Sequence, residues 1–256
     1  MTPRLSVVVP AFCEQDRIGA TVGRLRRALP ADGVEIVVVD DGSPDATAEA
    51  ARRAGADQVL RLPANRGKGA AVRAGMVAAG GRVRAFTDAD LSYPPEQLIR
   101  LLEEVEAGCD VVVGSRRHVD TTTLVRARRL REASGRVFSL LTRLVLLQEL
   151  RDTQCGLKAF SADAALLLFS RSRIDSFAFD VELFYLAERF GLRVCEVSVQ
   201  LANSEVSSVS LGLDAARMLR DLFRIRRLAA AGAYEVEGSE RRPLLGCPGP
   251  HGDGGR

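Results

Sequence analysis

Short apolar runs alternate with amphipathic stretches along the first 115 residues. Uninterrupted apolar runs of this length are typical of strands that are buried on both faces of a parallel sheet. The stretches between them have the spacing of helices. This βαβα order with short connections predicts an α/β fold with a mostly parallel central sheet flanked by helices. The predicted strands are at 5–10, 34–39, 59–62, 83–87 and 110–114, and the predicted helices are at about 16–29, 44–54, 68–79 and 94–107.

The second half of the chain has a less regular pattern. We expect helices at 128–148, 180–190 and 213–230, and a strand at 192–199. From about residue 232 the chain is rich in glycine, proline and charge, which predicts a disordered tail. The predicted organisation is one domain over 1–231, with halves at about 1–115 and 116–231, followed by a tail over 232–256.

Turn residues define the ends of several elements. Ser43 is a natural helix N-cap with Pro44 at the first helical position, and Gly55 is expected to end that helix. Pro30 ends the first helix and Gly191 the one at 180–190. The first strand lacks a following G-x-G-x-x-G turn, which disfavours a dinucleotide-dependent enzyme.

Composition narrows the class of protein. Of the 256 residues, 46% are hydrophobic and 27% are charged, as in ordinary globular proteins, and the net charge of +3 gives no reason to expect a nucleic-acid partner. No window has the roughly 18 uninterrupted apolar residues that a membrane span needs. The cysteines are scattered and odd in number, which favours a reducing cytosol over a disulfide framework or a zinc knuckle; they are residues 13, 109, 155, 195 and 247.

Asp88-Ala89-Asp90 follows directly on an apolar run. Period-2 geometry would point both carboxylates the same way if the strand continued, and a turn there can converge them on one ion. This is the strand end where open α/β sheets bind ligands. Hard carboxylate oxygens suit Mg²⁺ or Mn²⁺ better than zinc. The same spacing also occurs in ordinary turns and helix caps, so the pair alone leaves both interpretations open.

The chain has only two lysines, Lys68 and Lys158, among 36 basic residues. A retained lysine can reflect a need for a compact point charge. Lys68 lies between Gly67 and Gly69 at a predicted helix start, where backbone N–H groups and the ammonium together suit an anion. The alternative is a plain helix-start turn.

Six motifs occur in the order and at the spacing of a known family. The chain resembles the family 2 inverting glycosyltransferases, which have the Rossmann-like GT-A fold. Within them it is most similar to the polyprenyl- and dolichyl-phosphate sugar synthases, especially the dolichyl-phosphate β-glucosyltransferase branch. The motifs are Val7–Glu14, Val39–Ser43, Asn65–Gly69, Asp88–Ser92, Gly114–Arg116 and Asp152–Phe160, the last supported by Arg131, Ser134 and Met218–Leu222.

The resemblance implies a nucleotide-sugar site in the first half. Asp88 and Asp90 are expected to hold a Mg²⁺ or Mn²⁺ ion, with Asp88 also near the ribose. Many mannosyl-phosphate synthases have glutamine where this chain has Ser92, which leaves a third metal contact open and favours the glucosyl branch. Asp41 is equally compatible with a structural role. The expected nucleotide-sugar contacts are Pro10, Ala11, Phe12, Glu14, Asp40, Lys68, Asp88 and Ala89.

The resemblance also implies an acceptor site in the second half. A phosphate monoester has a second pKa near 6, so a lipid phosphate is largely anionic at neutral pH and needs no strong base. Asp152 is a candidate helper base, or it orders the loop before Gln154. The expected acceptor-phosphate residues are Arg116, Arg131, Ser134 and Lys158, and the expected catalytic residues are Asp90, Arg116, Arg131 and Asp152.

The predicted function is metal-dependent, inverting transfer of a hexose to polyprenyl phosphate. Glucose from UDP-glucose is favoured and mannose from GDP-mannose comes next. We expect a cytoplasmic protein bound peripherally to the cytoplasmic membrane face, through the basic and apolar stretches at 124–147 or 213–230. The alternative for each stretch, and the favoured one for 213–230, is an ordinary amphipathic helix that packs on the core. The alternatives are a soluble family 2 transferase acting on a saccharide or small-metabolite hydroxyl, and a non-catalytic nucleotide-sugar-binding protein.

Overall fold

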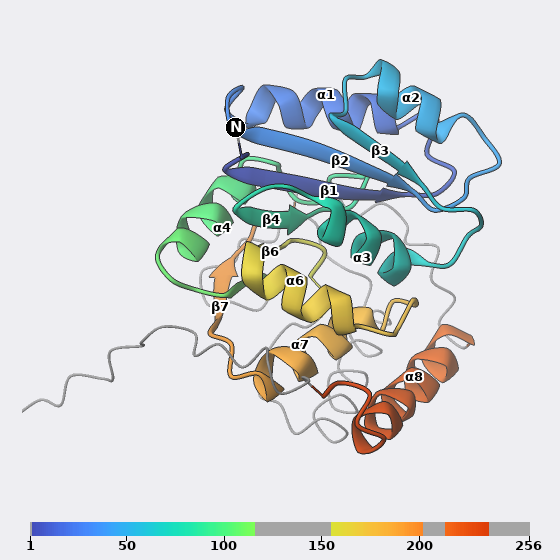
Figure 1. Cartoon of the computed structure of the whole chain (residues 1–256). Coiled ribbons are helices and arrows are strands. Elements are labelled where there is room, and N and C mark those ends of the chain that lie inside the picture. The colour runs from blue at the N-terminus through green and yellow to red at the C-terminus, as the bar shows by residue number, and fades with distance from the viewer. Residues whose placement is uncertain (1, 116–154, 202–212, 236–256) are drawn as a thin grey trace, which may run out of the picture.

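The computed structural model describes residues 2–115, 155–201 and 213–235, with side chains in the last segment from Arg220 onward (Figure 1). The helix predicted at 128–148 therefore lies outside the described residues. So do residues 236–256 of the predicted tail.

The described strands form one seven-stranded sheet with the order β3-β2-β1-β4-β6-β5-β7. All neighbouring strands are parallel except β6, which is antiparallel to both β4 and β5. The predicted α/β class with a mostly parallel sheet is confirmed. The strands are β1 (Leu5–Ala11), β2 (Val34–Asp40), β3 (Gln58–Arg61), β4 (Val83–Phe86), β5 (Val111–Ser115), β6 (Lys158–Ser161) and β7 (Val194–Ser198).

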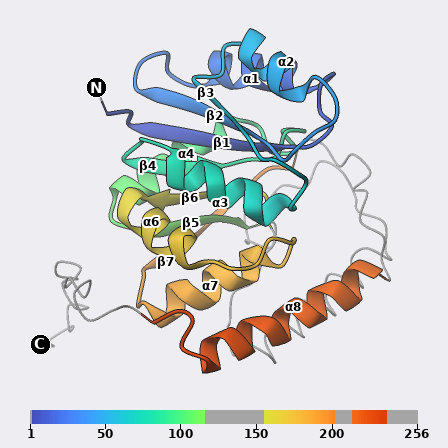
Figure 2. The same ribbon diagram turned by 45° about the vertical axis from the view of Figure 1, so that its right-hand side comes forward.

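Helices flank the sheet and extend the molecule at both ends. Helices α1 and α2 lie together at one end, and α7 and α8 lie at the opposite end in both views (Figures 1 and 2). Helices α3 and α6 pack side by side between them. The helices are α1 (Ile18–Ala28), α2 (Thr47–Arg53), α3 (Lys68–Ala78), α4 (Gln97–Glu106), α6 (Ala162–Arg171), α7 (Phe179–Arg189) and α8 (Leu213–Ala230).

The core lies where the apolar runs predicted it. Every residue from Leu5 to Val9 in β1, and from Ile36 to Asp40 in β2, is buried. Continuous burial follows from coverage of both sheet faces, and each fully buried valine or leucine contributes roughly 1.5–3 kcal/mol of transfer free energy. This rigid centre fixes the strand ends from which the loops of the site begin.

The helix after β2 begins later than predicted. Helix α2 starts at Thr47, so Ser43 is not its N-cap. Instead the Ser43 N–H donates to Asp40 Oδ1 at 2.9 Å, and Ser43 Oγ accepts from the Cys13 N–H at 2.9 Å. Ser43 thus joins the loops after β1 and β2, and that use competes with helix capping.

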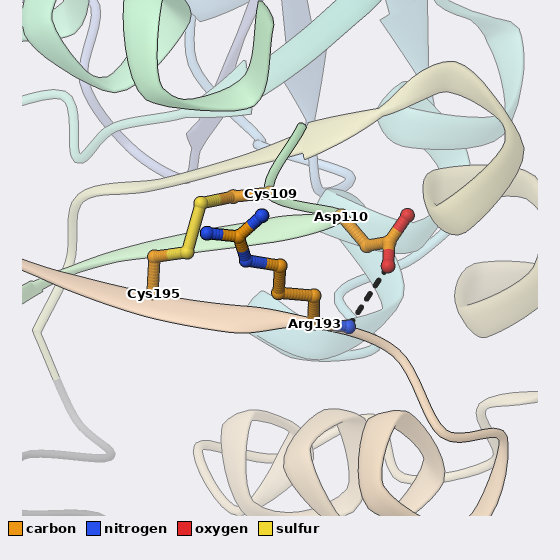
Figure 3. The surroundings of a disulfide bond; sticks show 4 residues. All are labelled: Cys109, Asp110, Arg193 and Cys195. Atoms are coloured by element: carbon orange, nitrogen blue, oxygen red, sulfur yellow. Dashed lines mark hydrogen bonds between the residues drawn. A yellow bond between two sulfur atoms is a disulfide. The ribbon is translucent and has the colours of Figure 1, made fainter. Parts of the chain in front are cut away.

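Two of the cysteines form a disulfide, contrary to prediction. Cys109 and Cys195 are bonded with their Cα atoms 6.1 Å apart (Figure 3). They are 86 residues apart in sequence but meet because β5 and β7 are parallel neighbours that start side by side. Beside the bridge, Asp110 Oδ2 accepts a hydrogen bond from the Arg193 N–H at 2.8 Å. Scattered cysteine spacing carries no information about such a contact between strands.

The folded chain also continues beyond the predicted start of the tail. Tyr234 is fully buried, and its hydroxyl donates to Glu182 Oε1 at 2.6 Å. Arg189 forms an ion pair with Glu235 at 2.5 Å. Residues 232–235 therefore pack against α7, and the predicted boundary at 232 is too early.

Candidate active site

The loops after β1, β2 and β4 meet at one edge of the sheet. β1 lies between β2 and β4, and the strand order reverses there. Such a switch point, at the carboxyl ends of parallel strands, is where open α/β sheets bind ligands. The Glu14 N–H donates to Thr47 Oγ1 at 2.9 Å, and the Asp41 N–H donates to the Ala11 carbonyl at 2.9 Å. These bonds hold the first two loops together.

Asp40 is buried at the centre of this edge. One carboxylate oxygen accepts the Ser43 N–H, while the other, Oδ2, has no hydrogen-bond donor among the described residues. Arg61 Nε lies 3.4 Å from Oδ2 and provides an ion pair without hydrogen-bond geometry. A buried acceptor without a donor is costly, so Asp40 Oδ2 is suited to accept a hydrogen bond from a ligand. Asp40 is 0% exposed, so a ligand would reach Oδ2 only if a covering side chain such as that of Arg61 moved aside.

The residues after β1 line the same edge. Phe12 is 43% exposed, Pro10 and Glu14 are half-buried, and Ala11 is buried. Cys13 has a φ of 56°, a left-handed conformation that non-glycine residues rarely adopt. This turn leaves the Phe12 ring at the surface, where it can stack on a planar base.

Asp41 has a structural position. Its two carboxylate oxygens accept the N–H groups of Arg66 and Gly67 at 2.9 and 2.7 Å. Burial raises the pKa of Asp41, and these two hydrogen bonds lower it again in part. Asp41 therefore ties the loop before α3 to the end of β2.

The backbone N–H groups at the start of α3 do not face an anion as expected. The Gly67 N–H is taken by Asp41, and the Gly69 N–H donates to the Asp175 carbonyl at 2.8 Å. A Cβ on Gly69 would lie 2.6 Å from the Ile174 carbonyl oxygen, so glycine is required for this close approach. Asp41 and the loop before α7 therefore take these two N–H groups, and the Lys68 side chain stays a candidate for binding the anion.

Lys68 forms an ion pair with Asp88, and its side chain is 19% exposed. Burial lowers the pKa of the Lys68 ammonium, but the charges of Asp88 and Asp180 outweigh that effect, so the pKa is raised overall. Lys68 therefore remains a cation at neutral pH. It pairs with Asp88, the carboxylate that the sequence predicts to bind a metal.

Asp90 is oriented by its own turn. Ser92 donates to it twice, from N–H to Oδ1 at 2.9 Å and from Oγ to Oδ2 at 2.8 Å. Leu91 has a φ of 47°, and the Ala89 carbonyl accepts from Thr21 Oγ1 at 2.6 Å. Ser92 thus orients Asp90. Ser92 has this role whether or not Ser92 itself contacts a metal.

The two aspartates fit a Mg²⁺ or Mn²⁺ ion. Both supply only oxygen donors, and a carboxylate oxygen that accepts one hydrogen bond retains a lone pair for a metal. The described residues contain no group of three or more His, Cys, Asp or Glu side chains that could hold a metal ion. Two carboxylates suffice for Mg²⁺, which usually takes its remaining ligands from water and substrate phosphates.

Gly156 brings the motif before β6 against this pair. A Cβ on Gly156 would lie 2.3 Å from Asp88 Oδ2, so any side chain there would displace the carboxylate. The sequence placed Gly156 within a motif but gave no reason for it. The reason is contact with an aspartate 68 positions earlier.

Lys158 is not placed as an acceptor-phosphate residue. Its side chain is fully buried, and its ammonium donates to the Cys155 carbonyl at 2.5 Å and to Asp180 Oδ1 at 2.8 Å. The rings of Phe86 and Phe184 lie 5.4 and 5.7 Å from the ammonium. The ammonium therefore has no surface to offer a phosphate.

Asp180 is a residue that the sequence analysis missed. It lies in the first turn of α7, where an aspartate is commonly a simple helix-start residue. Its burial beside Lys158 could not be seen without the pairing of β6 and the packing of α7. Four of the predicted residues, Arg116, Arg131, Ser134 and Asp152, lie outside the described residues.

Comparison with known proteins shows which protein family the chain belongs to. The family model for glycosyl transferase family 2 matches residues 6–169. The chain belongs to this family and is a glycosyltransferase.

Its relatives narrow the resemblance further. The chain is 34% identical to dolichyl-phosphate β-glucosyltransferase from Drosophila melanogaster, over 93% of this chain and 79% of that protein. It is 32% identical to the human protein of the same name, over 92% of this chain and 79% of the relative. The predicted branch of the family is thereby confirmed.

A solved structure agrees on the fold. Glucosyl-3-phosphoglycerate synthase from Mycobacterium tuberculosis, in complex with Mg²⁺ and UDP, superposes with a TM-score of 0.63. The match covers 90% of this chain and 80% of that one, at 24% identity. The fold is GT-A, as predicted.

Proposed function

We propose that this protein transfers glucose from UDP-glucose to a polyprenyl phosphate, with inversion at the anomeric carbon. The observation that carries the proposal is the Asp88–Asp90 turn at the end of β4, rigidly held and paired with Lys68. The names of the relatives supply the sugar and the lipid acceptor.

The donor nucleotide would lie along the ends of β1, β2 and β4. Asp40 Oδ2 accepts an N–H of the base, and Phe12 covers the base plane. Asp88 and Asp90 would hold a Mg²⁺ or Mn²⁺ ion, which would neutralise charge on the leaving diphosphate. Lys68 adds a positive charge at the same phosphates and orients them.

The acceptor is a phosphate that is largely anionic at neutral pH. It therefore needs cations that position it more than it needs a base. Arg116, Arg131 and Ser134 are proposed for this task, with Asp152 as a helper base or loop-ordering residue. Lys158 is buried in an ion pair with Asp180, so we do not assign Lys158 to the acceptor.

A lipid acceptor requires contact with a membrane surface. In the described residues no helix has the length and apolar character needed to cross a bilayer. Helix α8 has an exposed face made of one aromatic residue and several arginines, and anionic headgroups attract such a face. Peripheral attachment through α8 is part of the proposal. The face consists of Arg220, Phe223, Arg224, Arg226 and Arg227.

The decisive test is transfer of radiolabelled sugar into an organic-extractable lipid. Purified protein is incubated with polyprenyl phosphate, Mn²⁺ or Mg²⁺, and separately UDP-glucose, UDP-N-acetylglucosamine or GDP-mannose. We expect labelled lipid with UDP-glucose and its loss on chelation by EDTA. Labelled lipid only with GDP-mannose would reassign the sugar, and transfer only to saccharide hydroxyls would reassign the acceptor.

Asp90→Ala tests the metal role within that assay. Loss of one of two carboxylate ligands should lower transfer at least 100-fold while thermal stability stays close to that of the wild type. Asp163→Ala, which removes an exposed carboxylate from the first turn of α6, is the matched control and should retain full activity. Full activity of Asp90→Ala would reject the metal role.

A further inference from the structure

Two lysines and two aspartates form a partly buried group of charges behind the candidate donor site. Lys68 pairs with Asp88, and Lys158 pairs with Asp180 at 2.8 Å. The second pair is the more buried, with side-chain exposures of 0% and 8%. The group contains equal numbers of positive and negative charges, so it is electrically balanced as it stands.

The two pairs are held close together by the backbone. Gly69 of α3 approaches α7 so closely that a Cβ there would lie 2.7 Å from Phe179 Cβ. Asp175 adds ion pairs to Arg66, at 3.0 Å, and to Arg73. The starts of α3 and α7, which carry Lys68 and Asp180, therefore form one rigid unit.

The charges of the two pairs also act on one another. Burial raises the pKa of Asp180, and the charges of Lys158 and Lys68 lower it again in part, while the charge of Asp180 helps to raise the pKa of Lys68. Asp180 is thus a second negative neighbour of Lys68, after Asp88. The need for a second neighbour follows from what Asp88 must do.

If Asp88 binds a metal ion, its carboxylate has two partners, the metal and the Lys68 ammonium. A divalent cation at Asp88 neutralises that carboxylate and repels the Lys68 ammonium beside it. Without another negative charge, Lys68 would be driven away from the diphosphate that it is proposed to bind. A buried carboxylate behind it would retain Lys68, provided its own burial is balanced by a cation.

We propose that Asp180 is a positioning residue for the donor site. It keeps the Lys68 ammonium aimed at the nucleotide diphosphate when Asp88 engages the metal, and Lys158 neutralises Asp180 from behind. This inference rests on the proposed use of Lys68 and Asp88 in donor binding. It assigns roles to a buried ion pair that does not itself contact the donor.

The test measures the affinity of the protein for UDP with Mn²⁺. Binding is measured by calorimetry and, separately, by the electron paramagnetic resonance signal of free Mn²⁺. Asp180→Asn should weaken binding about tenfold or more, and it should also lower the melting temperature because the buried Lys158 ammonium is left without a counter-charge. Lys158→Met/Asp180→Asn removes both charges and should restore the melting temperature while binding stays weak. Asp163→Asn, at the equivalent first-turn position of α6, should bind as the wild type does.

A double-mutant cycle shows whether Asp180 acts through Lys68. In a Lys68→Met background, adding Lys158→Met/Asp180→Asn should weaken UDP·Mn²⁺ binding less than threefold further, because the residue to be positioned is gone. Equal losses in both backgrounds would overturn the inference, and so would recovery of both stability and affinity in Lys158→Met/Asp180→Asn. If the wild type binds neither UDP nor GDP with Mn²⁺, the proposed function itself fails.

Discussion

The space beside Asp88 depends on the absence of a single methyl group. Gly156 has no Cβ, and one placed there would overlap Asp88 Oδ2 at 2.3 Å. The metal-ligand candidate therefore depends on a residue that carries no functional group. A glycine in a motif can thus be essential because it leaves room for another residue.

Gly156→Ala should weaken UDP·Mn²⁺ binding at least tenfold, because Asp88 must turn away from the added methyl group. The same calorimetric titration measures it. Gly19→Ala is the control, since a Cβ there has no neighbour closer than 4.0 Å and alanine favours the helix by roughly 0.5–1 kcal/mol. Wild-type affinity in Gly156→Ala would show that Asp88 is not needed in its present position.

At the scale of single residues, the sequence predicted where the candidate donor-site residues lie better than it predicted which residues they contact. Asp88 and Asp90 follow the end of β4, where the apolar run placed them, and Asp40 is buried at the end of β2. The Gly67 and Gly69 amides and Lys158 were misassigned. The Gly67 amide is bonded to Asp41, and the partners of the Gly69 amide and of Lys158 are Asp175 and Asp180. All three partners are distant in sequence and give no local signal.

The elements of the first half follow their hydrophobic pattern closely. β1, β2 and β5 coincide with predicted runs to within one residue, because continuous apolar sequence has only one way to be buried between two helical layers. The antiparallel direction of β6 was not predictable. It depends on the path of the connection before it, and residues 116–154 of that connection lie outside the described residues.

Helix α7 is held to the end of the described chain by one buried hydrogen bond. Tyr234→Phe removes the donor to Glu182, which still accepts the N–H groups of Arg173 and Ile174. We expect a loss of about 1 kcal/mol in the free energy of unfolding, measured with urea. The matched control is Tyr185→Phe, whose ring lies 6.1 Å from that of Tyr234 and which should unfold like the wild type. Equal stability of the two variants would contradict this role for Tyr234.

At the scale of the whole molecule, α8 and α1 lie at opposite ends (Figure 2). If α8 faces the membrane, α1 faces away from it. The proposed attachment can therefore be tested with equal charge changes on two helices of the same molecule.

Arg224→Gln/Arg227→Gln on α8 should weaken binding to vesicles containing phosphatidylserine. At about 1 kcal/mol for each arginine near an anionic surface, the loss is roughly thirtyfold, and it should shrink as salt is added. Arg24→Gln/Arg27→Gln on α1 makes the same charge change on exposed residues and should bind as the wild type does. Equal effects of the two pairs, measured by vesicle sedimentation, would reject attachment through α8.

The disulfide contributes to the stability of the whole fold. By the chain-entropy model, closing a loop with a sequence separation of 86 stabilises the folded state by up to about 4 to 5 kcal/mol. Cys109→Ala/Cys195→Ala should therefore melt at a lower temperature than the oxidised wild type, and a reductant should lower the melting temperature of the wild type alone. If the wild type melts at the same temperature with and without reductant, the disulfide does not stabilise the fold.

The same disulfide closes part of the chain into a covalent ring. The ring consists of the backbone from Cys109 to Cys195 and the disulfide between their side chains. The N-terminal part of the chain is attached at Cys109 and the C-terminal part at Cys195. One engineered protease cut anywhere between Asp110 and Val194 would open this ring without releasing a fragment. The cut protein would migrate as one species on a non-reducing gel and as two on a reducing gel, which makes the bridge visible without any measurement of activity.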